Sequence, residues 1–269
     1  MPFPLAHPAA VLPLMRGPLV ASALVAGAVA PDLLYVGAGY RFATMYIDGN
    51  LTITRTHEFS SAFWLDPLLA LVILLVFQLL VKRPLLALAP SALAGRLPSP
   101  AVRARIPSLV QVFWIVVSTV IGAFTHVLWD SFTHYDGYFV RRWRFLTADI
   151  TPFWDVNRVL QYLSSVGGVL VIAVWLYFWW RKTPPSPVDA TRYVSRAARY
   201  GVLAAVILLA AVAAAVEVGR AEGPLLGEAV ARLVLTGAAS GVLLALAGYV
   251  LIWHALRLRQ LQRERVAAL

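Results

Sequence analysis

Five long apolar runs constrain the fold of this chain more than any other feature of its sequence. At about 1.5 Å per helical residue, each run is long enough to cross the roughly 30 Å hydrocarbon core of a bilayer. Only 13% of the 269 residues are charged and 60% are hydrophobic, whereas soluble domains carry about 25% charged residues. The pattern predicts an all-α, polytopic membrane helix bundle with spans at about 64–81, 109–129, 159–180, 199–218 and 229–254.

Basic residues concentrate in three of the segments that join or follow these runs. If each run crosses once, the loops 82–108 and 181–198 and the C-terminal tail lie on one side, which the positive-inside rule assigns to the cytoplasm. We therefore expect a bacterial inner-membrane protein with a cytoplasmic C-terminus and with segments 37–63 and 130–158 outside. On the predicted cytoplasmic side, only two acids, Asp189 and Glu264, stand against the basic residues Lys82, Arg83, Arg96, Arg103, Arg105, Arg181, Lys182, Arg192, Arg196, Arg257, Arg259, Arg263 and Arg265. On the predicted outer side, the charges are balanced and include Arg41, Arg55, Asp48 and Glu58.

The first 36 residues allow two interpretations. Two short apolar pieces, at about 8–15 and 19–30, flank Met15-Arg16-Gly17-Pro18, and neither piece spans a bilayer alone. One interpretation is a single bent span with His7 and Asp32 on opposite faces. The other is an N-terminal re-entrant helical hairpin, which Gly-Pro favours as a strong turn signal. The hairpin would keep the N-terminus outside, and the absence of a basic start and a cleavage motif speaks against a removable signal peptide.

Three ionisable residues, His126, Asp130 and His134, follow one another at intervals of four in GAFTHVLWDSFTHYDG. On a helix they would form one stripe. Ionisable groups are costly beside an apolar run and usually serve a function there, and imidazole and carboxylate groups four residues apart commonly hold a metal ion. The alternative for each is an ordinary hydrogen-bonding residue near the membrane interface, and we expect that role for His254 at the inner end of the last span.

Further imidazoles and carboxylates fall on the same predicted outer side, at His7, Asp32, His57 and Glu58. Three or four of these groups could hold a divalent ion, with zinc the best fit and manganese or iron as alternatives. Such an ion lowers the pKa of a water that it binds, and Glu58 could then act as a general base. Arg158, at the start of the fourth run, could bind an anionic head group, or could simply be part of a polar helix start.

The segments MPFPLAHPAAVLPL, SALVAGAVAPD, THEFSSAFW, GAFTHVLWDSFTHYDGYFV and VLQYLSSVGG occur in this order within residues 1–180. Together they resemble an uncharacterised bacterial integral-membrane family, numbered forty-one eighty-four among the domains of unknown function. The order of histidines and aspartates is also similar to that of membrane-bound metal-dependent hydrolases and of the all-α zinc-dependent phospholipases C. That wider resemblance implies one or two ions, since the late His-x-x-x-Glu ligands of the soluble phospholipases have no counterpart here. The ligands that it implies are His7, Asp32, His57, His126 and Asp130, with His134 as a further candidate.

The sequence therefore predicts a membrane-embedded, metal-dependent hydrolase that acts on a lipid or lipid-linked phosphoester at the outer membrane interface. Residues 1–180 would carry the metal site, and residues 181–269 would supply two packing helices and a basic tail within one structural unit. The net charge of +10 is explained by the basic loops, so nucleic acid is not an expected partner. One alternative is a non-catalytic structural or partner-binding membrane protein. The other is a transporter, but the clustering of the polar groups and the lack of an internal repeat disfavour a transporter.

Overall fold

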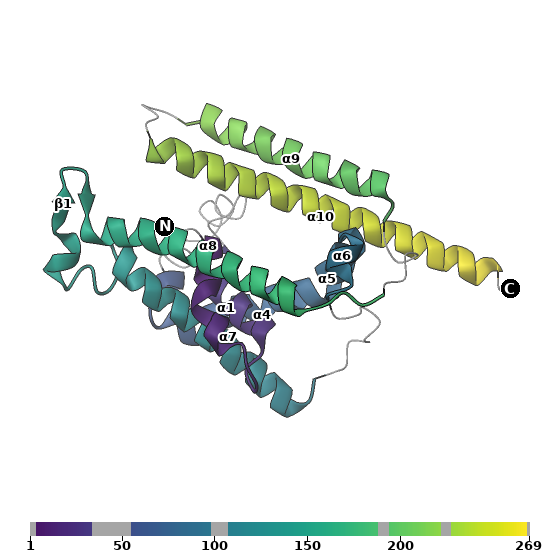
Figure 1. The fold of residues 1–269 in the computed structure, drawn as a ribbon, viewed down its shortest axis with the longest axis horizontal. Helices are drawn as coiled ribbons and strands as arrows, with labels where there is room; N and C mark the ends of the chain where they lie inside the picture. Colours follow the sequence, from purple (N-terminus) through teal and green to yellow (C-terminus); the bar gives the residue numbers. More distant parts are fainter. Residues whose placement is uncertain (1–3, 34–54, 98–106, 188–193, 222–226, 268–269) are drawn as a thin grey trace. The chain divides into compact units, whose positions relative to one another are not determined.

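Long apolar helices dominate the computed structural model, which describes residues 4–33, 55–97, 107–187, 194–221 and 227–267 (Figure 1). Five of them are long and apolar enough to cross a membrane, so the predicted all-α polytopic bundle is confirmed. These are Leu65–Leu88, which comprises α4 (Leu65–Val76), a π-helical turn (Phe77–Val81) and α5 (Lys82–Leu88), α7 (Leu109–Thr133), α8 (Val156–Lys182), α9 (Arg196–Gly219) and α10 (Glu228–Ala267). The loop charges predicted at Arg41, Asp48, Arg103, Arg105, Asp189 and Arg192 lie outside the described residues.

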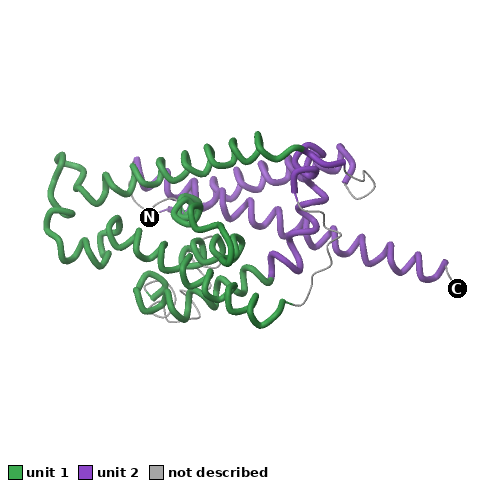
Figure 2. The backbone as a smooth tube through the Cα atoms, turned by 60° about the horizontal axis from the view of Figure 1, so that its bottom comes forward, with its two compact units in different colours: residues 1–34, 42–75, 103–184 green, residues 35–41, 76–102, 185–269 purple. Residues whose placement is uncertain are grey.

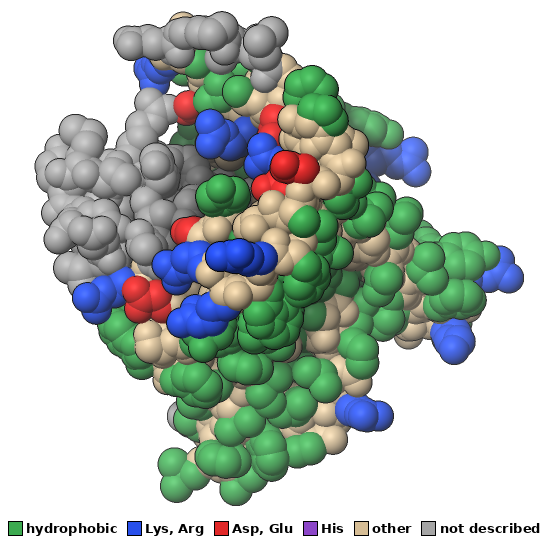
Figure 3. Space-filling model, turned by 90° about the vertical axis from the view of Figure 1, so that its left-hand side faces the viewer, with side chains coloured by type: hydrophobic (Ala, Val, Ile, Leu, Met, Phe, Trp, Pro, Cys, Tyr) green, Lys and Arg blue, Asp and Glu red, His purple; other side chains and the backbone are tan. Residues whose placement is uncertain are grey.

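The surfaces of these helices are largely apolar. Leu170 on α8 and Ile207 on α9 expose 59% and 69% of their area, and many further leucine, valine and aromatic side chains on the long helices are similarly exposed. Figure 3 shows broad hydrophobic surface beside a region where acidic and basic side chains mix. Apolar surface on this scale is unfavourable in water and favourable in a bilayer. The chain is therefore a multi-pass membrane protein.

The N-terminal segment folds as a hairpin rather than as a single bent helix. A 3-10 helix, η1 (Pro4–Leu14), is followed by a turn and by α1 (Ala21–Val29), and Val11 packs with Leu24 and Ala28 in a buried cluster. Prolines at positions 8 and 13 have no N–H to donate, which prevents a regular α-helical ladder in η1. The hairpin brings its two ends, and so His7 and Asp32, together.

Helices α1 and α7 make a close backbone contact at two glycines. A Cβ added to Gly27 would lie 2.9 Å from the backbone nitrogen of Ala123, and one added to Gly122 would lie 2.9 Å from the nitrogen of Ala28. Neither position has room for a side chain. Because α1 lies so close, the carbonyl oxygen of Ala28 reaches the side chain of His126.

The chain divides into two compact units (Figure 2). The first comprises residues 1–34, 42–75 and 103–184, and also holds the short helices η3 (Arg55–His57), η4 (Ser61–Phe63) and η6 (Arg144–Thr147) and an antiparallel pair of strands, β1 (Asp149–Thr151) and β2 (Trp154–Asp155). The second comprises residues 35–41, 76–102 and 185–269, and includes α6 (Ser91–Ala94). Within it, α9 packs against α10 at Gly237 and Gly241, where small residues let the two backbones approach.

Candidate metal centre

The C-terminal turns of α7 carry two buried ionisable side chains, His126 and Asp130. The helix starts with a capping box between Ser108 and Gln111 and ends at Thr133. The turn that follows requires a glycine, since a Cβ on Gly137 would lie 2.6 Å from the carbonyl oxygen of Ser131. As the four-residue spacing predicts, His126 and Asp130 lie on one face, with Nε2 and Oδ2 separated by 3.2 Å.

The hairpin places His7 and Asp32 against this face of α7. The His7 ring stacks on His126 with centroids 3.8 Å apart, and it meets the Trp129 ring edge to face with centroids 5.4 Å apart. Nε2 of His7 lies 3.5 Å from Oδ1 of Asp130 and 4.0 Å from Oδ2 of Asp32. His7, Asp32, His126 and Asp130 expose 3% or less of their area.

His57 comes from η3 and completes the cluster in the first unit. Its Nε2 atom lies 3.4 Å from Oδ1 of Asp32 and 3.3 Å from Oδ2 of Asp130. Asp32, His57, His126 and Asp130 each offer one ligand atom, and all four atoms lie within 4.8 Å of one another. His134 caps the end of α7, and its Nδ1 atom lies 3.3 Å from Oδ2 of Asp130.

These separations are those expected around a cation. Ligand atoms that surround a zinc ion tetrahedrally at about 2.0–2.1 Å lie roughly 3.3 Å from one another. The shortest distances from the Asp130 oxygens to the nitrogens of His7, His57, His126 and His134 range from 3.2 to 3.5 Å. The four described side chains of the central group can therefore bind a metal ion, and their imidazole and carboxylate atoms suit zinc, manganese or iron.

Several atoms of the cluster make no hydrogen bond of acceptable geometry within the described part of the chain. Burying polar atoms without partners costs about 1–3 kcal/mol each, and more for charged groups. A cation bound among them would be a partner for atoms of this set, so the residues present fit such an ion. The atoms are both ring nitrogens of His7, both carboxylate oxygens of Asp32 and of Asp130, Nε2 of His126 and Nδ1 of His134.

Two of the imidazoles are held by a contact at the nitrogen that faces away from the cluster. Nδ1 of His126 donates to the carbonyl oxygen of Ala28 over 2.7 Å, because a carbonyl can only accept. In the neutral ring, this leaves a lone pair on Nε2 of His126, the nitrogen that faces Asp130. The hydroxyl of Thr56 lies within hydrogen-bonding distance of Nδ1 of His57, at 3.1 Å. Such contacts fix ring orientation and raise ligand affinity in metal sites.

Two imidazoles outside the five long helices, those of His7 and His57, have opposite pKa shifts. Burial, reinforced by His126, lowers the pKa of His7 to about 3, so its ring is neutral and able to donate a lone pair. Burial also acts to lower the pKa of His57, but the adjacent carboxylates of Asp130 and Asp32 outweigh it and raise that pKa to about 10. A metal ion that binds His57 must therefore displace a proton.

The remaining predicted residues lie elsewhere. Glu58, next to His57, has an exposed side chain whose Oε2 accepts from Ser60 over 3.3 Å. Arg158 is half-buried in the first turn of α8. Their catalytic roles stay predictions. His254 belongs to the second unit, and its Nε2 atom lies 2.9 Å from the carbonyl oxygen of Leu80, the hydrogen-bonding role expected for it.

Asp66, which the sequence pattern did not single out, is fully buried in the first turn of α4. Its Oδ2 atom accepts from the hydroxyl of Ser61 over 2.8 Å, and its charge acts on His57 and His126. Its Oδ1 atom makes no hydrogen bond among the described residues. The available signal was an acid at the very start of an apolar run, where a charge is costly and often functional.

Comparison with known sequences places the chain in a family. The profile described as "Domain of unknown function (DUF4184)" matches residues 1–251, so the chain belongs to this family and the predicted resemblance is confirmed. The match extends beyond residues 1–180 and includes α9 and much of α10. No curated protein and no solved structure matches the chain.

Proposed function

We propose that this chain is a metal-dependent hydrolase of the bacterial inner membrane that cleaves a lipid or lipid-linked phosphoester at the outer membrane interface. The observation that carries the proposal is the set of buried imidazole and carboxylate atoms that converge at the end of a membrane helix and have no hydrogen-bond partner among the described residues. Buried ionisable groups in membrane proteins are costly and are usually retained for function. Zinc is the ion that the histidine-rich donor set favours, with manganese or iron as alternatives.

The position of Asp130 along α7 supports a substrate at head-group depth. Asp130 lies in the last turn of this 25-residue helix, about 30 Å from Leu109 at the other end. Leu109 follows the basic loop 82–108, which the positive-inside rule assigns to the cytoplasm. The cluster would then lie near the outer interface, where phosphate groups of lipids are found.

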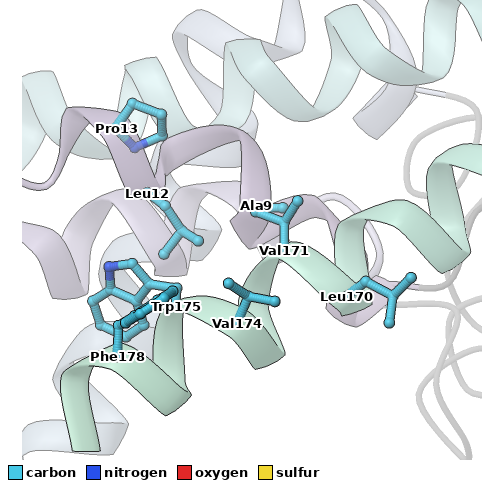
Figure 4. Close-up of a pocket in the computed structure, with 8 residues that line it drawn as sticks. All are labelled: Ala9, Leu12, Pro13, Leu170, Val171, Val174, Trp175 and Phe178. Atoms are coloured by element: carbon cyan, nitrogen blue, oxygen red, sulfur yellow. The ribbon is translucent and has the colours of Figure 1, made fainter. Parts of the chain in front are cut away.

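An apolar groove near the cluster supports a lipid substrate. The groove has a volume of about 540 Å³ and lies in the first unit between η1 and α8. Figure 4 shows Ala9 and Val171 near its middle, with Leu12, Trp175 and Phe178 gathered toward one end. Ala9 is two residues from His7 on η1, so an acyl or prenyl chain in the groove would hold its head group near the cluster.

The residues of the cluster divide into ligands and groups that act on the substrate. His7, Asp32, His57, His126 and Asp130, with His134 at the edge, would hold the ion. When bound, a divalent ion supplies a Lewis acid for a phosphoryl oxygen and lowers the pKa of water. The carboxylate of Asp66, or that of the exposed Glu58, would accept a proton from that water. Arg158 would bind an anionic oxygen of the substrate.

A lipid-cleavage assay with matched histidine variants tests the proposal. Purified protein, loaded with Zn²⁺ or Mn²⁺, is mixed with vesicles of phosphatidylethanolamine, phosphatidylglycerol and a polyprenyl phosphate, and products are identified by mass spectrometry. We expect wild type and His254→Ala to cleave one of these lipids, and His126→Ala and Asp130→Asn to lose at least about 100-fold in rate.

Two results would overturn the proposal. One is a metal-loaded wild type that leaves every phosphoester intact, which would favour a structural role for the ion. The other is a folded His126→Ala variant that cleaves at the wild-type rate, because the reaction would then not depend on the cluster.

A further inference from the structure

The two buried aspartates present their oxygens to different histidines. Oδ2 of Asp130 lies 3.2 Å from Nε2 of His126 and 3.3 Å from that of His57, whereas Oδ1 faces His7 at 3.5 Å. Asp32 repeats the pattern: Oδ1 lies 3.4 Å from His57 and 3.7 Å from His126, and Oδ2 lies 4.0 Å from His7. Each carboxylate thus has one oxygen toward the His57–His126 pair and one toward His7.

The stacking of His7 on His126 makes a single shared ion unfavourable. The two rings are 22° from parallel with centroids 3.8 Å apart. An imidazole nitrogen donates its lone pair in the plane of its ring. An ion shared by both Nε2 atoms would lie on the order of 1–2 Å out of at least one ring plane, which is a large displacement for a bond of about 2.0–2.1 Å.

We propose that the centre binds two divalent cations bridged by Asp32 and Asp130. One cation is held by His57, His126, Oδ1 of Asp32 and Oδ2 of Asp130, with His134 beside it. The second is held by His7, Oδ2 of Asp32 and Oδ1 of Asp130. The separation of the stacked rings, 3.8 Å, is close to the distance of about 3.5–4 Å between the ions of two-metal sites.

Buried polar atoms without hydrogen bonds give independent support for the second cation site. His7 is completely buried, and neither of its ring nitrogens makes a hydrogen bond within the described residues. The two oxygens that it faces, Oδ2 of Asp32 and Oδ1 of Asp130, are likewise without one. With a single ion bound by the other oxygens and histidines, these three groups would remain buried and unsatisfied, which is unfavourable.

The charge of a two-ion centre bears on the class of substrate. Two divalent cations carry four positive charges, against two negative charges from Asp32 and Asp130 and at most one more from Asp66. The remaining positive charge, in a buried site, favours an anionic ligand such as a phosphoester over a neutral ester or amide. This inference rests on metal binding in the proposed function, but it does not require that hydrolysis occurs.

Metal counting on the full-length protein tests the proposal. Wild type, His7→Phe and the control His254→Ala are equilibrated with excess Zn²⁺, passed through a desalting column and submitted to elemental analysis. Phenylalanine preserves a ring that can stack on His126 but removes the donor atoms. We expect two equivalents in wild type and His254→Ala and one in His7→Phe. We also expect inorganic phosphate, used as a probe, to bind the loaded wild type at least about tenfold more tightly than His7→Phe.

Electron paramagnetic resonance of the wild type gives a count that needs no variant. The first equivalent of Mn²⁺ should give an isolated six-line signal, and the second should weaken the signal per ion through coupling across the carboxylates. One equivalent at saturation, two equivalents in His7→Phe, or equal phosphate binding by both proteins would overturn the proposal. Two ions without lipid cleavage would refute only the hydrolase function, and one ion with cleavage would refute only the two-ion centre.

Discussion

The close contact between α1 and α7 makes Gly122→Ala the most informative substitution outside the cluster. A Cβ at this position would overlap the carbonyl oxygen of Leu24 and lie 2.9 Å from the nitrogen of Ala28 and 3.0 Å from Cα of Gly27. All three atoms are backbone, so no side-chain rotation can relieve the overlap. The helices would have to separate by about 1 Å to restore normal packing.

The magnitude follows from the hydrogen bond that lies next to this contact. The 2.7 Å bond from Nδ1 of His126 to the carbonyl of Ala28 would lengthen to about 3.7 Å, beyond hydrogen-bonding distance. We therefore expect metal affinity to fall about 10–100-fold, the usual loss when such a supporting contact is removed. Overpacking should also lower the free energy of unfolding by about 1–3 kcal/mol.

Gly167→Ala on α8 is the matched control, because a Cβ there meets nothing within 4 Å. Alanine is the better helix former by up to about 1 kcal/mol, so this variant should be as stable as wild type or slightly more stable. Thermal unfolding in detergent and competition with a fluorescent zinc chelator measure the two effects. If Gly122→Ala matched Gly167→Ala in both assays, the close approach of α1 would not be what orients His126.

Three further predictions concern the base, the pH dependence and the second unit. Asp66→Asn should retain the bound metal but lose at least about tenfold in turnover, with a changed pH–rate profile, and an unchanged profile would exclude Asp66 as a proton acceptor. Metal affinity, measured by chelator competition, should rise about tenfold per pH unit from pH 7 to 9. The reason is that the ion displaces the proton of His57, whose pKa is about 10 when no ion is bound. An affinity independent of pH would contradict this prediction. Gly241→Leu should destabilise the α9–α10 pair, since even a Cβ there would lie 2.7 Å from Cα of Ala210, yet leave the metal count unchanged; loss of metal would show that the two units are coupled.

Much of the fold could be predicted because its signals are local. Length and apolarity define the five spans, and helix periodicity places His126 and Asp130 on one face whatever surrounds them. The Gly17-Pro18 turn signal favoured the hairpin for a similar reason, because the backbone preference of those residues does not depend on distant contacts. The helices extend beyond the predicted runs because polar and charged residues can continue a helix past the apolar core.

The neighbouring residues His57 and Glu58 show that the sequence could not predict which side chain faces the cluster. Both are ionisable, both were predicted to take part, and only His57 lies in the cluster while Glu58 is exposed. In a short irregular segment, no periodicity determines which side chain faces inward, so packing decides. Asp66 was missed for the related reason that an acid in a first helical turn is also typical of an exposed helix start.

The sequence by itself determined that the chain is a membrane helix bundle and that its imidazoles and carboxylates gather toward one end, since both follow from the order of apolar and polar residues along the chain. Only the tertiary structure decided which of these groups meet and how. The stacking of His7 on His126, and the division of the oxygens of Asp32 and Asp130 between them, depend on α1 approaching α7 at Gly27 and Gly122. That approach is a contact between segments almost a hundred residues apart, and local preferences cannot specify it.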